Sequence, residues 1–224
     1  MHVTIIAKAP RAGVVKTRLC PPCTPEQAAE VAAAALRDTI AGVRALLAEL
    51  APSWPVAPAG ALEPVLLWDG QVDQWGDGFR VVPQCQGGLG ERLAAGFTEL
   101  GAGVIIGMEA PAAVRHLAVG LRAAAAGIDS LGLATDGGYW MVGLGVRSSA
   151  EASDIFSGVP MSTSHTGLAQ LRRFAALGRP VRLLPMARDL DTVDDLHAAA
   201  RSDFDGELRR IARRVVGMEP TGSG

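Results

Sequence analysis

The first segment whose residues could do chemistry is AKAPRAGVVKTRL, residues 7–19. A glycine-bearing loop that exposes backbone N–H groups beside several cations can surround the oxygens of a di- or triphosphate. The candidate phosphate-binding residues are Lys8, Gly13, Lys16, Thr17 and Arg18. The segment is not a P-loop, because the spacing G-x-x-x-x-G-K-[ST] is absent. The alternative is a solvated basic loop. Phosphate binding is favoured because 19 of the 21 basic residues of the chain are Arg, and both lysines lie in this one segment.

Three carboxylates are candidate metal ligands. Glu109 follows the apolar run VIIG, and Asp189 and Asp191 stand two positions apart in RDLDTVDDL. Alternate residues of extended chain point the same way, and two aligned carboxylates near a strand end suit Mg²⁺ or Mn²⁺ together with substrate phosphates. Each acid also has a structural explanation. Glu109 could instead stabilise the first turn of a following helix, where acidic residues are favoured. Asp191 could instead be the residue before a helix that begins with a capping box of Thr192 and Asp195.

A turn and two aromatic residues form the third candidate, TDGGYWMVGL. Asp136, Gly137 and Gly138 are typical of a turn that leads into an apolar strand, so a structural hairpin explains most of this segment. Tyr139, the one tyrosine of the chain, stands beside Trp140. Aromatic residues next to such a turn can line a substrate pocket, although packing in a core is the commoner use.

These residues need elements that bring them together. Short apolar runs predict strands at 3–6, 65–68, 79–82, 104–107, 129–134 and 181–185. The clearest helix begins after Thr24, with Pro25 in its first turn and Gln27 as capping-box partner. Further helices are predicted at 89–100, 112–126, 166–177, 192–201 and 206–216. This alternation predicts a three-layer α/β/α sandwich with a mostly parallel sheet, in which ligands bind beyond the carboxyl ends of the strands.

Composition limits the classes of partner. The chain has 224 residues, of which 49% are hydrophobic, and a formal net charge of −2, which fits one domain over 1–217 followed by a disordered tail at 218–224. With a sequence pI near 6.1, the chain lacks the excess of basic residues that is typical of proteins binding nucleic acid or an anionic membrane. No apolar run approaches the roughly 18 residues of a membrane span. The start of the chain lacks the order of a signal peptide, and three cysteines suit no disulfide framework, so we expect a cytoplasmic protein.

Six motifs occur in a fixed order along the chain: KAPRAGVVKTRL, QGGLGERL, GMEAP, DGGYWMVGL, GVPMST and DLDTVDDL. Together they resemble the radical-SAM/selenodomain-associated transferase 1 family, which is often labelled a glycosyltransferase and is related to the MobA and CofC nucleotidyltransferases. The resemblance runs from Lys8 to Leu196 and therefore covers nearly the whole chain.

The resemblance implies a GT-A fold, the Rossmann-like sandwich of nucleotide-diphospho-sugar transferases. Its nucleotide-binding half would be about 1–110 and its acceptor half about 111–217. The resemblance also implies a role for each candidate. The donor phosphates would contact Lys8, Gly13, Lys16 and Arg18; the metal would be held by Glu109, Asp189 and Asp191; and the acceptor would be bordered by Asp136 to Tyr139.

Three functions remain open at this point. The first is a Mg²⁺- or Mn²⁺-dependent, glycosyltransferase-like enzyme with a nucleotide-sugar donor and a small-molecule acceptor. In it, Lys16, Glu109 and Asp191 would carry catalysis by stabilising charge on the departing phosphate. The second is a nucleotidyltransferase of the CofC/MobA type, which uses a nucleoside triphosphate and releases pyrophosphate.

The third is a catalytically degenerate protein that binds a nucleotide or a partner. It is motivated by a departure from the family, which writes G-S-D-S-P or G-T-D-C-P where this chain has GMEAP. Glu109 keeps the charge but moves it by one methylene, while Met108 and Ala110 replace two small polar side chains.

Overall fold

The computed structural model describes residues 1–55, 60–71, 74–145 and 149–218. Apart from Met218, the tail predicted to be disordered lies outside these residues. Within them, seven strands form one sheet in the order β3-β2-β1-β4-β6-β5-β7. The strands are β1 (His2–Lys8), β2 (Glu63–Asp69), β3 (Arg80–Pro83), β4 (Gly103–Gly107), β5 (Asp129–Ala134), β6 (Tyr139–Leu144) and β7 (Val181–Ala187).

The sheet is mostly parallel, as the alternation of strands and helices predicts. Strand β1 pairs in parallel with β2 and β4, β2 with β3, and β5 with β7. The exception is β6, which lies antiparallel between β4 and β5. The predicted hairpin at Asp136–Gly138 therefore joins β5 to β6 and brings its turn to the carboxyl end of β4.

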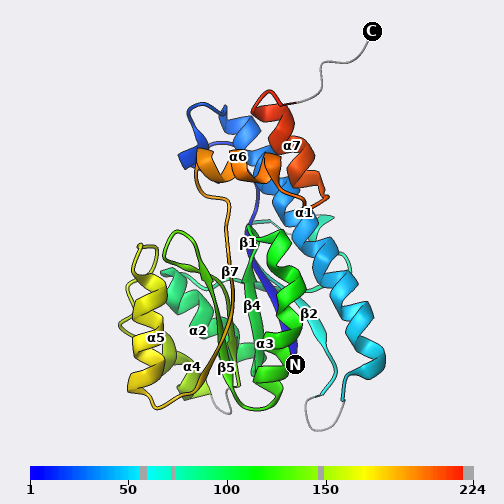
Figure 1. The fold of residues 1–224 in the computed structure, drawn as a ribbon. Helices are drawn as coiled ribbons and strands as arrows, with labels where there is room; N and C mark the ends of the chain where they lie inside the picture. Colours follow the sequence, from blue (N-terminus) through cyan, green and yellow to red (C-terminus); the bar gives the residue numbers. More distant parts are fainter. Residues whose placement is uncertain (56–59, 72–73, 146–148, 219–224) are drawn as a thin grey trace.

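Seven α-helices and four 3₁₀ turns lie around the sheet in the described residues (Figure 1). The helices are α1 (Pro25–Leu50), α2 (Leu89–Leu100), α3 (Leu117–Ala125), α4 (Ser149–Phe156), α5 (Thr166–Ala176), α6 (Val193–Arg201) and α7 (Glu207–Val215). The 3₁₀ turns are η1 (Thr17–Leu19), η2 (Ala51–Ser53), η3 (Gln74–Gly76) and η4 (Pro111–His116). The helix predicted at 112–126 is thus divided, since η4 precedes α3, and α4 was not predicted.

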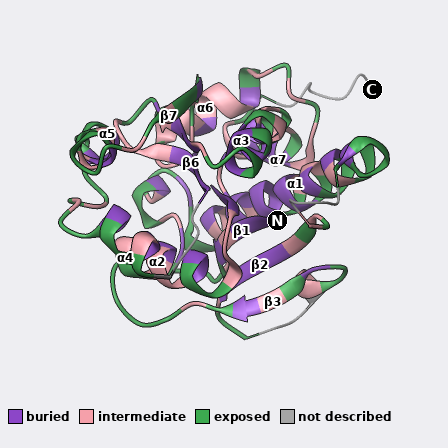
Figure 2. Ribbon diagram, turned by 90° about the horizontal axis from the view of Figure 1, so that it is seen from below, coloured by how far each residue is buried: buried purple, intermediate pink, exposed green. Residues whose placement is uncertain are grey.

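The helices form the two outer layers of the predicted sandwich. Helices α1 and α3, with η4, share an apolar cluster with Val3, Ile5 and Trp68 on one face of the sheet. On the other face, α2, α4 and α5 share a cluster with Ile105 and Leu131. Figure 2 shows the buried residues concentrated in the central strands and on the helix surfaces that face them.

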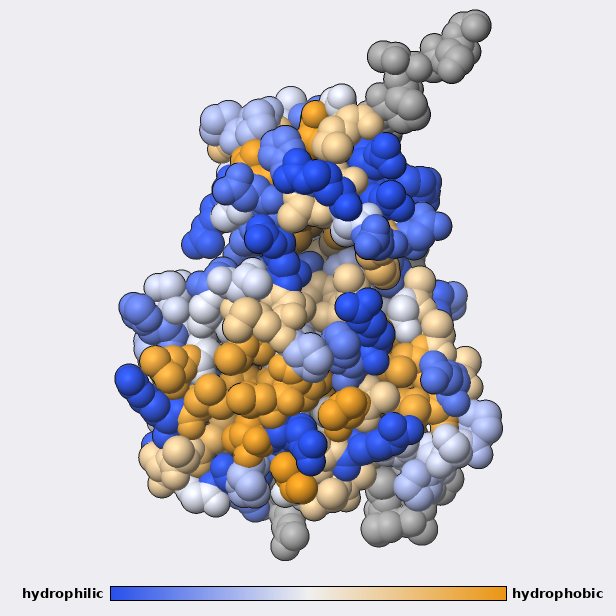
Figure 3. Space-filling view, viewed as in Figure 1, coloured by the Kyte–Doolittle hydropathy of each residue, from blue (hydrophilic) through white to orange (hydrophobic). Residues whose placement is uncertain are grey.

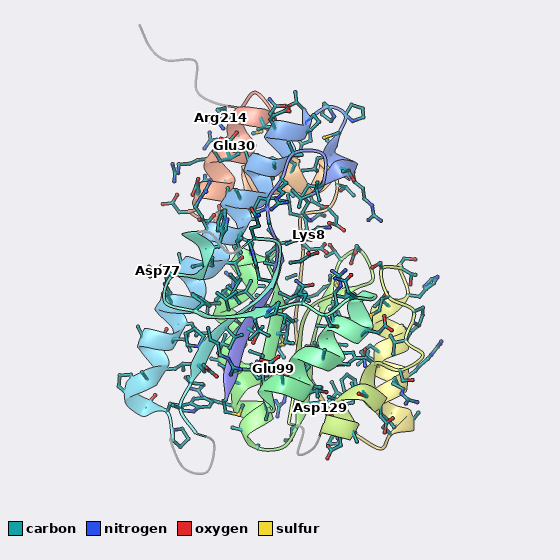
Figure 4. The ribbon with its side chains drawn as sticks, turned by 180° about the vertical axis from the view of Figure 1, so that it is seen from behind. Lys8, Glu30, Asp77, Glu99, Asp129 and Arg214 are labelled. Carbon is teal, nitrogen blue, oxygen red and sulfur yellow. The ribbon has the colours of Figure 1, made fainter. Side chains whose placement is uncertain are left out.

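A separate group of helices covers the carboxyl ends of the strands. Helices α6 and α7 pack on the first half of α1 around their own apolar cluster, and Figure 1 shows this cap above the sheet. The Asp38 carboxylate of α1 accepts hydrogen bonds from the backbone N–H groups of Glu207 (2.9 Å) and Leu208 (2.8 Å) at the start of α7. The Arg214–Glu30 ion pair adds a contact between the same helices, and Figure 4 shows both residues at the cap.

The surface differs between the cap and the body of the molecule. Figure 3 shows hydrophilic residues around α6 and α7, and a gathering of apolar residues on the face that carries α3 and β7. Strand β7 is an edge strand with two exposed apolar side chains, Leu183 and Met186. Among the described residues, no helix is long and apolar enough to cross a membrane.

Candidate functional site

A cavity of about 750 Å³ opens where the carboxyl ends of β1 and β4 meet the cap. Ten of the residues predicted from the sequence line it: Lys8, Lys16, Thr17, Arg18, Glu109, Asp136, Gly138, Tyr139, Asp189 and Asp191. Two predicted residues, Gly13 and Gly137, do not line it. Figure 4 shows Lys8, the last residue of β1, at the waist between the body of the molecule and the cap helices.

The loop after β1 carries the cations into this cavity. The backbone N–H groups of Val14 (3.1 Å) and Val15 (3.2 Å) donate to the carbonyl of Arg11, and the turn is completed by Gly13 at φ +72°. Val15 is buried in the core cluster beside β1, which anchors the loop, whereas Val14 is 51% exposed. Gly13 therefore sets the shape of the loop, and its contact with a donor phosphate stays a prediction.

Lys16 lies between two of the carboxylates. Its Nζ is 2.5 Å from Glu109 Oε2 and 2.7 Å from Asp191 Oδ1, and its side chain is only 5% exposed. Arg18 Nη1 reaches the other oxygen of Asp191 at 3.5 Å. Burial by itself would lower the pKa of Lys16, but the two carboxylates outweigh it and raise that pKa. Lys16 is therefore a fixed positive charge at this point of the cavity.

The third carboxylate is that of Asp189, and among the described residues no lysine or arginine forms an ion pair with it. Oxygens of Glu109, Asp189 and Asp191 all lie within 4.8 Å of one another. Burial, followed by repulsion from Asp136 and the other two acids, raises the pKa of Asp189 to about 7. Lys16 thus offsets only part of the negative charge. A hard divalent cation such as Mg²⁺ takes oxygen ligands of this kind, so the three carboxylates fit a metal.

In the DLDTVDDL segment, the predicted capping box is compatible with the clustering of Asp189 and Asp191 at the cavity. The capping box forms: Asp195 N–H donates to Thr192 Oγ1 at 3.3 Å, and Thr192 N–H donates to Asp195 Oδ2 at 2.7 Å. The backbone N–H of Asp191 also donates to Asp195 Oδ2 at 3.1 Å. Since Asp195 is the cap, the carboxylate of Asp191 is left to pair with Lys16.

The β5–β6 turn is fixed by its own side chain and by a neighbouring loop. Gly138 N–H donates to Asp136 Oδ1 at 2.8 Å. Gly137 has φ +91°, and a Cβ there would lie 2.0 Å from the carbonyl oxygen of Ser164. This glycine is therefore required for the close approach of the turn to the loop at 161–166, and its contact with a substrate stays a prediction. Burial raises the pKa of Tyr139, whose hydroxyl lies 3.5 Å from Met161 Sδ.

Sequence reasoning missed a polar pair on the far side of the cavity. Gln84 donates from Nε2 to the carbonyls of Ala7 (2.8 Å) and Leu67 (3.0 Å), which joins the ends of β1 and β2. Its Oε1 accepts from Arg92 Nη1 at 3.1 Å, and Arg92 Nε donates to Gly87 O at 2.9 Å. Both Gln84 and Arg92 line the cavity. The motif QGGLGERL contains Arg92, but Arg92 was predicted only as part of the helix at 89–100.

The loop at 162–166 was also missed as a lining element. Four hydroxyl-bearing residues of this segment line the cavity: Ser162, Thr163, Ser164 and Thr166. Ser162 has φ +58° and Lys16 has φ +51°. Among the described residues, these are the two non-glycine residues with positive φ. Strained backbone of this kind gathers at functional sites. Since both positions line the same cavity, it is the best candidate site in the described chain.

Comparisons with known proteins bear on the fold and on the family. No curated protein matches the chain. A crystal structure of a candidate nucleotide-diphospho-sugar transferase from Desulfovibrio desulfuricans superposes with a TM-score of 0.76 at 19% identity, covering 97% of this chain and 95% of that one. The fold is therefore the GT-A-like fold of nucleotide-diphospho-sugar transferases, as predicted. The family described as "Uncharacterized protein conserved in bacteria (DUF2064)" matches residues 46–163, which is more than half of the chain. The chain belongs to this family.

Proposed function

We propose that the chain is a transferase that takes a nucleotide-activated donor and depends on Mg²⁺ or Mn²⁺. The donor is a nucleotide sugar and the acceptor a small molecule, as in a glycosyltransferase. One observation carries the proposal: a single cavity at the carboxyl ends of β1 and β4 holds a cationic loop, three clustered carboxylates and a loop of hydroxyl groups. The likeness to a candidate nucleotide-diphospho-sugar transferase supports it.

Each part of the cavity has a proposed task. Lys8, Lys16, Thr17 and Arg18 bind the donor phosphates, since cations and a hydroxyl group converge there. Glu109, Asp189 and Asp191 hold the metal, which when bound neutralises charge on the departing phosphate.

On the acceptor side, Asp136, Gly138 and Tyr139 border the second substrate. The residues up to about 110 then form the nucleotide-binding half of one domain, and 111–217 form the acceptor half. We further propose that the chain falls within the radical-SAM/selenodomain-associated transferases and acts in the cytoplasm.

A specific observation favours a second candidate. Four cationic side chains line the cavity, and they come from three elements: Lys8, Lys16, Arg18 and Arg92. This number suits the charge of a nucleoside triphosphate, which a nucleotidyltransferase of the CofC/MobA type would use with release of pyrophosphate. The released product separates the two enzymes, because sugar transfer releases a nucleoside diphosphate instead.

The contact between Lys16 and Glu109 favours a third candidate, a protein that binds a nucleotide or a partner without turnover. A thermal-shift panel of nucleoside di- and triphosphates and nucleotide sugars, with Mg²⁺ or with EDTA, tests all three. A ligand at about 100 times its Kd adds about 2.7 kcal/mol, which is roughly 5 to 10 °C for a domain of this size.

The outcomes separate the candidates. A shift that needs Mg²⁺, followed by product release, supports an enzyme. A shift that is indifferent to EDTA favours the binding protein. If none of the nucleotides shifts the melting temperature, all of the nucleotide-binding functions are refuted.

A further inference from the structure

The Lys16 ammonium occupies a position at the acidic cluster that a bound cation would take. It contacts two of the three candidate metal ligands, Glu109 and Asp191, at 2.5 and 2.7 Å. Its side chain is almost fully buried, while Lys8, the other lysine of the cavity, is 49% exposed and lies 3.8 Å from Asp69. Lys16 is therefore bound to the cluster itself.

A metal ion and this ammonium draw on the same oxygens. Mg²⁺ binds carboxylate oxygens at about 2.0–2.1 Å and requires nearly ideal octahedral geometry. A metal held by Glu109 and Asp191 would bring its charge close to the Lys16 ammonium, where repulsion between like charges is strong in a site of reduced dielectric. The ammonium must therefore move when the metal binds.

The displaced ammonium needs a new anion. A buried charge that loses its partner is costly, and Lys16 is flanked on its own loop by Thr17 and Arg18, which face the same cavity. The phosphates of a nucleotide are the anions that this cavity would take under the proposed function. A nucleotide that binds Lys16 thus frees the carboxylates for the metal.

We propose that Lys16 is a built-in competitor of the metal, so that the metal binds well only together with a nucleotide. The proposal rests on the proposed function for its nucleotide part alone. As a consequence, the chain's own cation occupies two of the three carboxylates until the donor binds. Because linkage is reciprocal, the metal tightens nucleotide binding by the same factor as the nucleotide tightens metal binding.

The test uses Mn²⁺ as the probe and follows the signal of free Mn²⁺ by electron paramagnetic resonance, without nucleotide. Lys16→Met removes the charge and keeps the length of the side chain. We expect this variant to bind Mn²⁺ alone about 5- to 150-fold more tightly than wild type, the usual range of coupling between sites. Arg80→Met, which removes a cation paired with Glu99 outside the cavity, is the control, and its affinity for Mn²⁺ should stay at the wild-type value.

The same substitution should act on the nucleotide in the opposite direction. In EDTA, Lys16→Met should bind UDP, GDP, ADP, CDP or dTDP, whichever binds wild type, more weakly than wild type does. A variant with damaged folding would lose both affinities, so the opposite signs identify competition. A Lys16→Met variant that binds Mn²⁺ no more tightly than wild type overturns the proposal.

A second variant protects the test if Lys16→Met does not fold. Lys16→Gln removes the charge and keeps a hydrogen-bond donor for the two carboxylates, so it should also tighten binding of Mn²⁺ alone; unchanged or weaker binding overturns the proposal. If no nucleoside diphosphate binds wild type under any condition, the proposed function fails. The Mn²⁺ titrations, which contain no nucleotide, still decide whether Lys16 competes with the metal.

Discussion

Lowering the pH from 7 to 4 should remove stability through His2, the first residue of β1. His2 is 1% exposed, and its Nε2 donates to the carbonyl of Gly101 at 3.1 Å while Nδ1 lies 2.7 Å from Thr4 Oγ1. Burial lowers the pKa of His2 from 6.5 to about 4. The folded protein therefore keeps this imidazole neutral at pH values where the unfolded chain binds a proton.

The size of the effect follows from the two pKa values. Below pH 6.5 the unfolded chain binds a proton at His2 that the folded protein refuses, so stability falls as the pH falls, until the folded pKa near 4 is passed. Each pKa unit corresponds to about 1.36 kcal/mol, so a difference of about 2.5 corresponds to a loss of about 3 kcal/mol. This is a large part of the 5–15 kcal/mol typical of a folded domain.

Asp189 should act with the opposite sign over much of the same range. Its folded pKa of about 7 lies above the ordinary value of 3.8, so the folded protein binds a proton that the unfolded chain does not. Stability through Asp189 therefore rises as the pH falls from 7 towards 4. The two linkages offset each other in wild type, and only variants reveal them.

Urea denaturation followed by tryptophan fluorescence, repeated from pH 4 to 7.5, measures both linkages. Relative to wild type, His2→Gln should gain about 3 kcal/mol between pH 7 and pH 4, whereas Asp189→Asn should become relatively less stable. Leu168→Gln, at an exposed position without a titratable group, is the control and should run parallel to wild type. If the His2→Gln profile also runs parallel to wild type, the argument from burial is refuted.

Three further predictions concern contacts around the cavity and the cap. Gly137→Ala should cost more than 2 kcal/mol, because its Cβ would lie 2.0 Å from Ser164 O; Gly158→Ala, with φ +73° and nothing within 4 Å, should cost only about 1–2 kcal/mol for its backbone, and equal losses of urea stability would contradict this. Arg92→Met should weaken binding of a nucleoside diphosphate about 10- to 100-fold, as loss of a charged hydrogen bond does, and calorimetry that finds no change would remove Arg92 from the site. Asp38→Ala should cost about 1–2 kcal/mol in urea, because two N–H groups of α7 lose their acceptor; an unchanged midpoint would contradict this role.

The sequence predicts local structure well where the signal is local. The capping box of Thr24 and Gln27 and the first-turn Pro25 mark the start of α1 correctly, and the apolar runs locate the strands. The position of β6 between β4 and β5 could not be predicted, because strand order depends on contacts between distant segments and not on periodicity. The division of the 112–126 helix into η4 and α3 also depends on packing, since Ala113 and Val114 are buried in the core of the first face.

For the candidate site too, the features that depend on local sequence could be predicted, whereas contacts between distant residues could not. Residue type and position after strands predicted ten of the residues that line the cavity, among them all three clustered carboxylates. The pairing of Lys16 with Glu109 and Asp191 could not be predicted, because these residues are distant in the chain and no spacing rule links them. Arg92 was missed because its motif also satisfies the simpler requirement of a turn before a helix.

The departure at GMEAP acquires a physical explanation from these contacts. Met108 and Ala110 are 5% and 2% exposed and belong to the core cluster of the α1–α3 face, so their apolar side chains satisfy packing. Glu109 is the charged residue of this segment that lines the cavity, and its carboxylate lies 2.5 Å from the Lys16 ammonium. A shorter Asp at this position would leave Lys16 with Asp191 as its closest partner. Relative to the pattern of the family that the sequence resembles, Glu109 therefore adds a contact to the internal ion pair, and its expected effect is on the competition between lysine and metal rather than on the fold.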